Sequence, residues 1–120
     1  MGKISERRKD KRYKVQDGAF VFFGSEPAMA GKVLDIGRQG LGFTYLASKS
    51  LTSGSITLAL MSTQRSFHCP ALIGRTVLDF PIPKKSITGK RRCGVEFEQL
   101  TQNQKSDIEH FIDCCTVGQE

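Results

Sequence analysis

The 120-residue sequence lacks several features that would each place it in a broad class of protein. It has no apolar run near the roughly 20 residues that cross a bilayer, which argues against a membrane-spanning chain. The charged N-terminus lacks the apolar segment that a signal peptide needs. In the absence of an export signal, we expect a cytoplasmic protein whose four cysteines are reduced thiols.

The sequence also offers little for catalysis or for metal binding. It has two histidines, no C-x-x-C pair and no G-x-x-x-x-G-K-[ST] phosphate loop. His110 and Cys114 are four residues apart, but zinc usually takes four ligands and this pair supplies only two. No spacing recommends Cys93 and His68 as a nucleophile and its base. We therefore expect a binding module rather than an enzyme, with no metal and no cofactor.

The residues that are present indicate one small all-β domain. The length and the hydrophobic fraction of 38% suit a single modest core. Short apolar or alternating segments between turn residues predict strands at 19–24, 30–36, 41–47, 55–61, 66–80 and 91–100. The strand at 66–80 is expected to be bent or interrupted, because Pro70 cannot donate to a ladder and indicates an edge or a bulge. This pattern favours an antiparallel barrel or sandwich.

The C-terminal segment has a helical pattern instead. Apolar residues repeat at i, i+3, i+4 and i+7 from Ile108 to Cys115, which predicts an amphipathic helix over about 101–115. Thr101 and Gln104 have the spacing of a capping box at its start. We expect this helix to dock its apolar stripe on the barrel or across an open end.

The positive charge is concentrated at the N-terminus. Residues 1–14 contain seven Lys or Arg and two acids, a net charge of +5, whereas the whole chain carries +6. Without an apolar period, this segment is expected to be a flexible basic arm before a folded domain at 15–118. Such an arm is either a solubility tail, a nucleic-acid arm or part of a ligand site. The near-neutral remainder of the chain disfavours nucleic acid.

Two segments suggest a ligand when they are considered together. In the arm, Arg8 and Arg12 are four residues apart, and planar guanidinium groups bind phosphate and the acceptor edge of guanine. The sequence DIGRQG at 35–40 places an acid and two glycines at a strand end and tight turn. Its carboxylate can accept hydrogen bonds from the N–H edge of guanine, and glycine lets the backbone approach a ligand closely. The two segments suit a ligand with both phosphate and guanine.

These segments resemble those of a PilZ domain, the bacterial receptor module for cyclic dimeric guanosine monophosphate (c-di-GMP). The stretch from Arg8 to Arg12 fits the family's RxxxR arm, and 35–40 fits its [D/N]xSxxG turn except at one position. RRCGVEFEQL at 91–100 resembles the family's closing G-V-x-F strand. The resemblance covers about residues 6–115. It implies a six-stranded antiparallel β-barrel with one C-terminal helix and a ligand site on the outer surface.

The resemblance also implies a role for each matching residue. Arg8 and Arg12 clamp phosphates and guanine edges as the arm folds over the ligand. Asp35 holds a guanine, and Gly40 gives the ligand room. The implied function is a c-di-GMP receptor or adaptor that changes conformation on binding and signals through a partner protein.

Three further residues of the two segments qualify this prediction. Arg7 and Arg38 are additional ligand candidates from charge and position alone. Gly37 stands where the family has serine, so one hydroxyl is missing and weaker ligand binding is expected. The alternative is a degenerate PilZ domain that acts by protein contacts without the nucleotide, and a lesser alternative is a barrel that binds nucleic acid through its arm.

Overall fold

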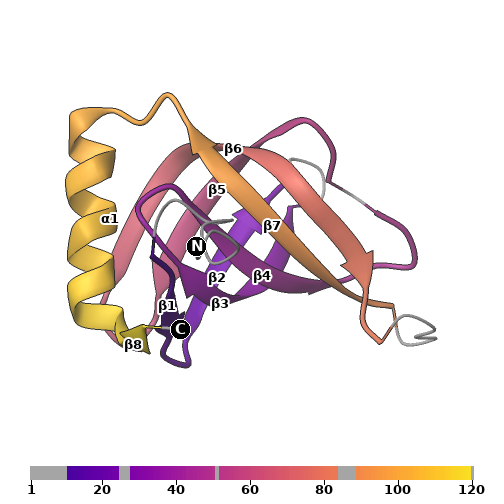
Figure 1. Ribbon diagram of the computed structural model, residues 1–120, viewed down its shortest axis with the longest axis horizontal. Coiled ribbons are helices and arrows are strands. Elements are labelled where there is room, and N and C mark those ends of the chain that lie inside the picture. The colour runs from indigo at the N-terminus through magenta and orange to yellow at the C-terminus, as the bar shows by residue number, and fades with distance from the viewer. Residues whose placement is uncertain (1–10, 25–27, 51, 84–88, 120) are drawn as a thin grey trace, which may run out of the picture.

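The computed structural model describes residues 11–24, 28–50, 52–83 and 89–119, which form eight strands and one helix (Figure 1). The strands are β1 (Tyr13–Val15), β2 (Ala19–Phe23), β3 (Met29–Ile36), β4 (Gly40–Leu46), β5 (Ser55–Ser62), β6 (Phe67–Pro81), β7 (Lys90–Glu98) and β8 (Thr116–Gln119). The helix α1 (Gln102–Cys115) lies between β7 and β8 in the chain. The predicted strand positions and the helix are confirmed to within a few residues.

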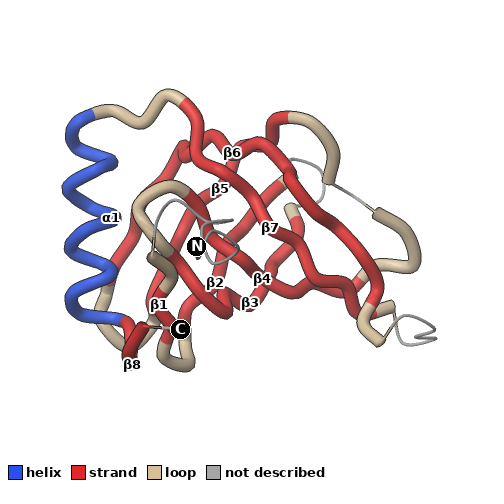
Figure 2. Tube along the Cα trace, in the orientation of Figure 1, coloured by secondary structure: helices blue, strands red, loops and turns tan. Residues whose placement is uncertain are grey.

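Six of the strands close into an antiparallel barrel, which confirms the predicted fold class. They are hydrogen-bonded in the order β2-β5-β6-β7-β4-β3, and a further pairing of β2 with β3 closes the ring. Figure 2 shows these strands crossing in two layers, with α1 standing along one side. The barrel therefore leaves an outer face on which polar side chains can gather.

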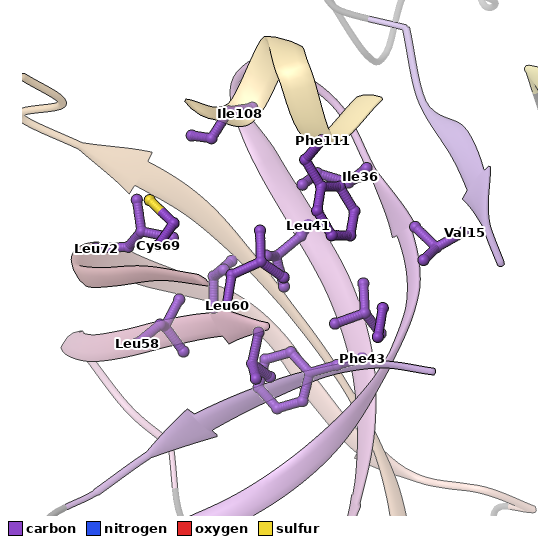
Figure 3. Packing of buried hydrophobic residues seen from close by; sticks show 14 of the residues in the cluster. Val15, Ile36, Leu41, Phe43, Leu58, Leu60, Cys69, Leu72, Ile108 and Phe111 are labelled. Carbon is purple, nitrogen blue, oxygen red and sulfur yellow. The ribbon is translucent and has the colours of Figure 1, made fainter. Parts of the chain in front are cut away.

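The helix packs its apolar stripe against the barrel, as predicted. Ile108 and Phe111 of α1 are buried, and Figure 3 shows the Phe111 ring pointing toward Ile36 and Leu41 of the barrel. The core continues to Phe43, which is also buried. No helix within the described residues is long and apolar enough to cross a membrane.

The start of α1 is bonded to a bulge in β6. Thr101 Oγ1 accepts from the Gln104 amide at 3.1 Å, and Gln104 Oε1 accepts from the Thr101 amide at 3.0 Å, which confirms the capping box. Gln104 Nε2 also donates to the Ala71 carbonyl at 3.0 Å. β6 runs on through Pro70, where its register with β5 shifts, so the proline marks a bulge in one continuous strand.

The sequence analysis does not predict the short strands β1 and β8. β1 begins at Tyr13, inside the range 1–14 assigned to the arm, and pairs with β3 through Tyr13–Ile36 and Lys14–Asp35. β8 pairs with the other edge of β1. Regular structure therefore begins before residue 15, and residues 1–10 of the expected arm lie outside the described part of the chain.

Candidate functional site

Asp35 is a buried carboxylate on the outer face of the barrel. Its neighbours in the β3–β4 ladder, Ile36 and Leu41, face the core. Alternation along each strand therefore turns Asp35 and its partner Gly42 outward. Even so, Asp35 is only 2% exposed, because two arginines lie over it.

The first of these arginines is Arg12, one of the predicted ligand residues. Arg12 Nη1 donates to Asp35 Oδ1 at 2.8 Å. The β1–β3 register explains this contact, because Lys14 pairs with Asp35 and Arg12 lies two residues earlier on the same face. The structure thus brings together one residue from each of the two predicted segments.

The second arginine, Arg92 of β7, is absent from the sequence-based prediction. Its Nη2 donates to Asp35 Oδ2 at 2.9 Å. β4 lies between β3 and β7, and Gly42 pairs with Asp35 on one side and with Gly94 on the other. A Cβ on Gly42 would lie 2.9 Å from Arg92 Nη2 and 3.1 Å from Asp35 Oδ1. The missing side chain at Gly42 lets Arg92 reach across β4.

The turn after Asp35 is closed by its two glycines. The Gly37 amide donates to the Gly40 carbonyl at 2.8 Å. A Cβ on Gly40 would clash with the Val95 carbonyl oxygen and would lie 3.0 Å from Arg12 Nη2. The close approach that requires glycine at position 40 is therefore made by β7 and by Arg12.

Arg38 and Gln39 connect this turn to its surroundings. Arg38 is exposed, and its Nε lies 3.3 Å from Glu109 Oε2 of α1. The Gln39 carbonyl accepts from the Phe97 amide of β7 at 2.7 Å. Figure 1 shows the β3–β4 turn on the side of the barrel that faces α1. The turn thus forms one rim of a space that β7 and α1 also border.

That space is a surface depression of about 960 Å³. The charged side chains that line it are Arg12, Arg38, Arg92, Lys105, Glu96 and Glu109. Both acids are paired, Glu109 with Arg38 and Glu96 with Arg75 of β6. Val77 and Leu78 add an apolar wall and are 45% and 42% exposed. The depression has the size and the mixed lining of a small-molecule site.

Five predicted ligand residues lie around this depression or in the turn beside it, namely Arg12, Asp35, Gly37, Arg38 and Gly40. Arg7 and Arg8 lie outside the described residues, so their predicted roles stay predictions. Arg92 could have been suspected from its outward position on the last strand. Nothing in the sequence, however, pairs it with Asp35.

A second carboxylate, on the partly buried residue Asp79 of β6, has a side chain that is 6% exposed and a different set of partners. Its Oδ2 accepts from the hydroxyls of Tyr45, Thr52 and Ser50 at 2.5, 2.5 and 2.8 Å. Its Oδ1 accepts from Arg91 Nε at 2.7 Å. Burial alone would raise the pKa of Asp79, but these hydrogen bonds outweigh it and hold the pKa below its usual value.

The structure does not bring Cys93 and His68 together as a reactive pair. Cys93 is buried in the core, and this burial raises the pKa of its thiol to about 11, so the thiol stays protonated at neutral pH. His68 is exposed on β6 beside Met61 of β5. In the part of the chain that the structure describes, no group of three or more His, Cys, Asp and Glu side chains could hold a metal ion.

No family model matches the chain, and no curated protein matches it in sequence. Solved structures do match. The inhibitor of motility MotI/DgrA of Bacillus subtilis has a TM-score of 0.68 at 16% identity, over 90% of this chain and 50% of that protein. This chain therefore spans half the length of MotI/DgrA.

The PilZ domain of YcgR from Escherichia coli, solved with c-di-GMP, has a TM-score of 0.63 at 15% identity. That match covers 92% of both chains. The closed six-stranded barrel with its C-terminal helix, found independently in the strand pairing, agrees with this likeness. The chain folds as a PilZ-like domain.

Proposed function

We propose that this chain is a receptor for c-di-GMP, which binds in the depression beside Arg12 and Arg92 and changes what a partner protein contacts. The observation that carries the proposal is the pair of guanidinium groups that Asp35 holds together at the wall of the depression. Guanidinium groups bind phosphate through paired hydrogen bonds and meet the O6 and N7 acceptors of guanine. The similarly folded YcgR domain was solved with this nucleotide.

In this proposal Asp35 acts first through its arginines. Both of its carboxylate oxygens accept from them, so it holds the two cations at a fixed distance despite their mutual repulsion. A direct contact from Asp35 to guanine stays a prediction, because Asp35 is only 2% exposed and one arginine must move aside before a ligand can reach it. We expect Arg12 to do so, because it precedes β1 whereas Arg92 lies within β7.

The apolar wall suits the rest of such a ligand. The register of β6 with β7 shifts between Thr76 and Leu78, a bulge that leaves Val77 and Leu78 exposed. A purine ring can pack a face against these side chains while its polar edge meets an arginine. The cations and the apolar wall together match the phosphates and the bases of a cyclic dinucleotide.

Calorimetric titration of c-di-GMP into the full chain tests the proposal. We expect saturable binding at micromolar concentration or tighter. Arg12→Ala and Arg92→Ala should each weaken it about tenfold to hundredfold, since a hydrogen bond from a charged group contributes about 1.5–3 kcal/mol. Arg65→Ala is the matched control, because Arg65 is exposed between β5 and β6 and does not line the depression. Equal losses in all three variants would contradict the assigned site.

The same titration separates the alternatives. If no heat and no rise in melting temperature appear at high ligand concentration, the degenerate domain that acts by protein contacts alone becomes the better hypothesis. If unrelated oligonucleotides bind instead, with an affinity that falls steeply as salt rises, the nucleic-acid hypothesis replaces both.

Gly37→Ser tests the departure from the PilZ turn. If the missing hydroxyl weakens binding, restoring it should tighten the affinity by about fivefold to tenfold, the value of one net hydrogen bond of about 1 kcal/mol. An unchanged affinity would mean that the ligand does not approach position 37.

A further inference from the structure

A second concave surface lies on the outer face of the barrel where β2, β3 and β4 run side by side. We name it the β3 groove, and its volume is about 430 Å³. The ladders place Phe20, Lys32 and Thr44 in one row across β2, β3 and β4. Leu46 and Lys90 form the next pair, between β4 and β7. All five residues line the groove.

The groove is apolar along its length. Leu46 is 67% exposed, the largest exposed fraction among the exposed large hydrophobic residues of the described chain. Phe20 and Met29 are half-buried and line the same surface. An isolated exposed leucine is ordinary, but a concave apolar surface bordered by charge is typical of a site that another molecule covers.

The charge at the groove is positive. Lys32 and Lys90 are both exposed, and no Asp or Glu is among the lining residues that the structure describes. Lys32 pairs with Asp17 at 3.8 Å, and 90% of the Asp17 side chain is exposed, so this pair is weak. A complementary ligand therefore offers carboxylates together with an apolar surface.

We propose that the β3 groove binds an acidic, amphipathic segment of a partner protein. Such a segment places its apolar side chains against Phe20, Met29 and Leu46 and its carboxylates against the two lysines. A membrane surface fits less well, because two lysines attract anionic lipid weakly and the apolar surface is recessed. Among the described residues, none lines both this groove and the depression beside Arg12 and Arg92 (the Arg12 depression), so the inference does not rest on nucleotide binding.

The test uses isotope-labelled full chain and two synthetic peptides of about 15 residues with leucines along one helical face. One peptide carries Glu at the other positions and the second carries Lys. We expect the Glu peptide alone to bind, and to shift the amide NMR signals of Ala30, Thr44 and Leu46.

Leu46→Glu should lower the affinity for the Glu peptide by at least about tenfold, because it replaces a buried apolar contact with charge repulsion. Val117→Glu is the matched control, because Val117 is 59% exposed on β8 and lies outside the groove. It should leave the affinity unchanged, and both variants should keep the melting temperature of the parent chain.

Several results would overturn the proposal. They are equal binding of both peptides, shifts confined to the Arg12 depression, no shift at millimolar peptide, or equal weakening by Leu46→Glu and Val117→Glu. Binding to vesicles of phosphatidylglycerol and phosphatidylcholine that Leu46→Glu abolishes, without binding of the Glu peptide, would replace it with a membrane surface.

Discussion

The carboxylates of Asp35 and Asp79 are both largely covered and bond to adjacent arginines of β7, yet their surroundings differ. Successive residues of a strand face opposite sides, so Arg92 reaches Asp35 on the outer face while Arg91 reaches Asp79. Asp79 also accepts from three hydroxyl groups. Asp35 is bonded to two arginines that line the depression.

This difference separates a structural role from a binding role. Neutral hydroxyl donors around Asp79 satisfy the carboxylate and join β4, β6 and the β4–β5 loop. A guanidinium group has five N–H donors, so an arginine that gives one or two to a carboxylate keeps others for a ligand. We therefore expect changes at Asp79 to reduce stability and changes at Asp35 to reduce ligand affinity.

The largest expected effect is the loss of stability in Asp79→Ala. Tyr45 and Thr52 are buried and lose this acceptor, and Arg91 loses its carboxylate. We expect the free energy of unfolding in urea to fall by about 3 kcal/mol, the cost of leaving such buried donors without an acceptor. Asp113→Ala, at an exposed position on α1, is the control and should change it little. Equal effects would show that the Asp79 cluster contributes no special stability.

Asp35→Asn should produce the opposite pattern. The neutral amide keeps the shape but holds Arg12 and Arg92 less strongly, so c-di-GMP should bind about tenfold to hundredfold more weakly. The free energy of unfolding should fall less than in Asp79→Ala. Calorimetry and urea unfolding of the same preparation measure both quantities, and retained affinity would remove Asp35 from the site.

Gly42→Ala should give a smaller loss of affinity. The added methyl group would lie 2.9 Å from Arg92 Nη2, so the arginine must move away from Asp35. We expect about tenfold weaker ligand binding and a stability cost of about 1 kcal/mol from overpacking. If calorimetry shows unchanged affinity, the Asp35–Arg92 contact is not needed for binding.

Acid pH should weaken the Asp79 cluster. Because the pKa of Asp79 is lowered in the folded chain, its contribution is fully present above the unfolded value, about 4, and is lost as pH falls through the folded value. Urea unfolding of the wild type and of Asp79→Asn, repeated from neutral pH to below about pH 4, measures this loss. The difference between their free energies of unfolding should become smaller as the pH falls. A constant difference would contradict the lowered pKa.

The barrel and helix could be predicted because their signals are local. Alternating residues of β4 such as Leu41, Phe43 and Tyr45 are buried in the hydrophobic core. The apolar stripe of α1 that begins at Ile108 packs against the same core. The short strands β1 and β8 have no such pattern. They exist because residues far apart in the chain pair, as Lys14 does with Asp35 and with Gly118.

The candidate site was predictable only in part, for the same reason. The resemblance to the PilZ motifs indicated Arg12 and Asp35, and the structure places them in contact. Strand alternation separates Arg92 from Arg91, but nothing in the sequence pairs Arg92 with Asp35. The register of β3, β4 and β7, with Gly42 between them, brings Arg92 to Asp35, and the register of β6 with β7 brings Arg91 near Asp79.

The most direct test of this comparison is an NMR titration of the labelled full chain with c-di-GMP. If the depression beside Arg12 and Arg92 binds the ligand, the amide signals of Gly42, Arg92 and Gly94 will shift in a saturable manner. The signals of Thr52 and Asp79 will stay in place. Shifts centred on Asp79, or none at saturating ligand, would contradict the account.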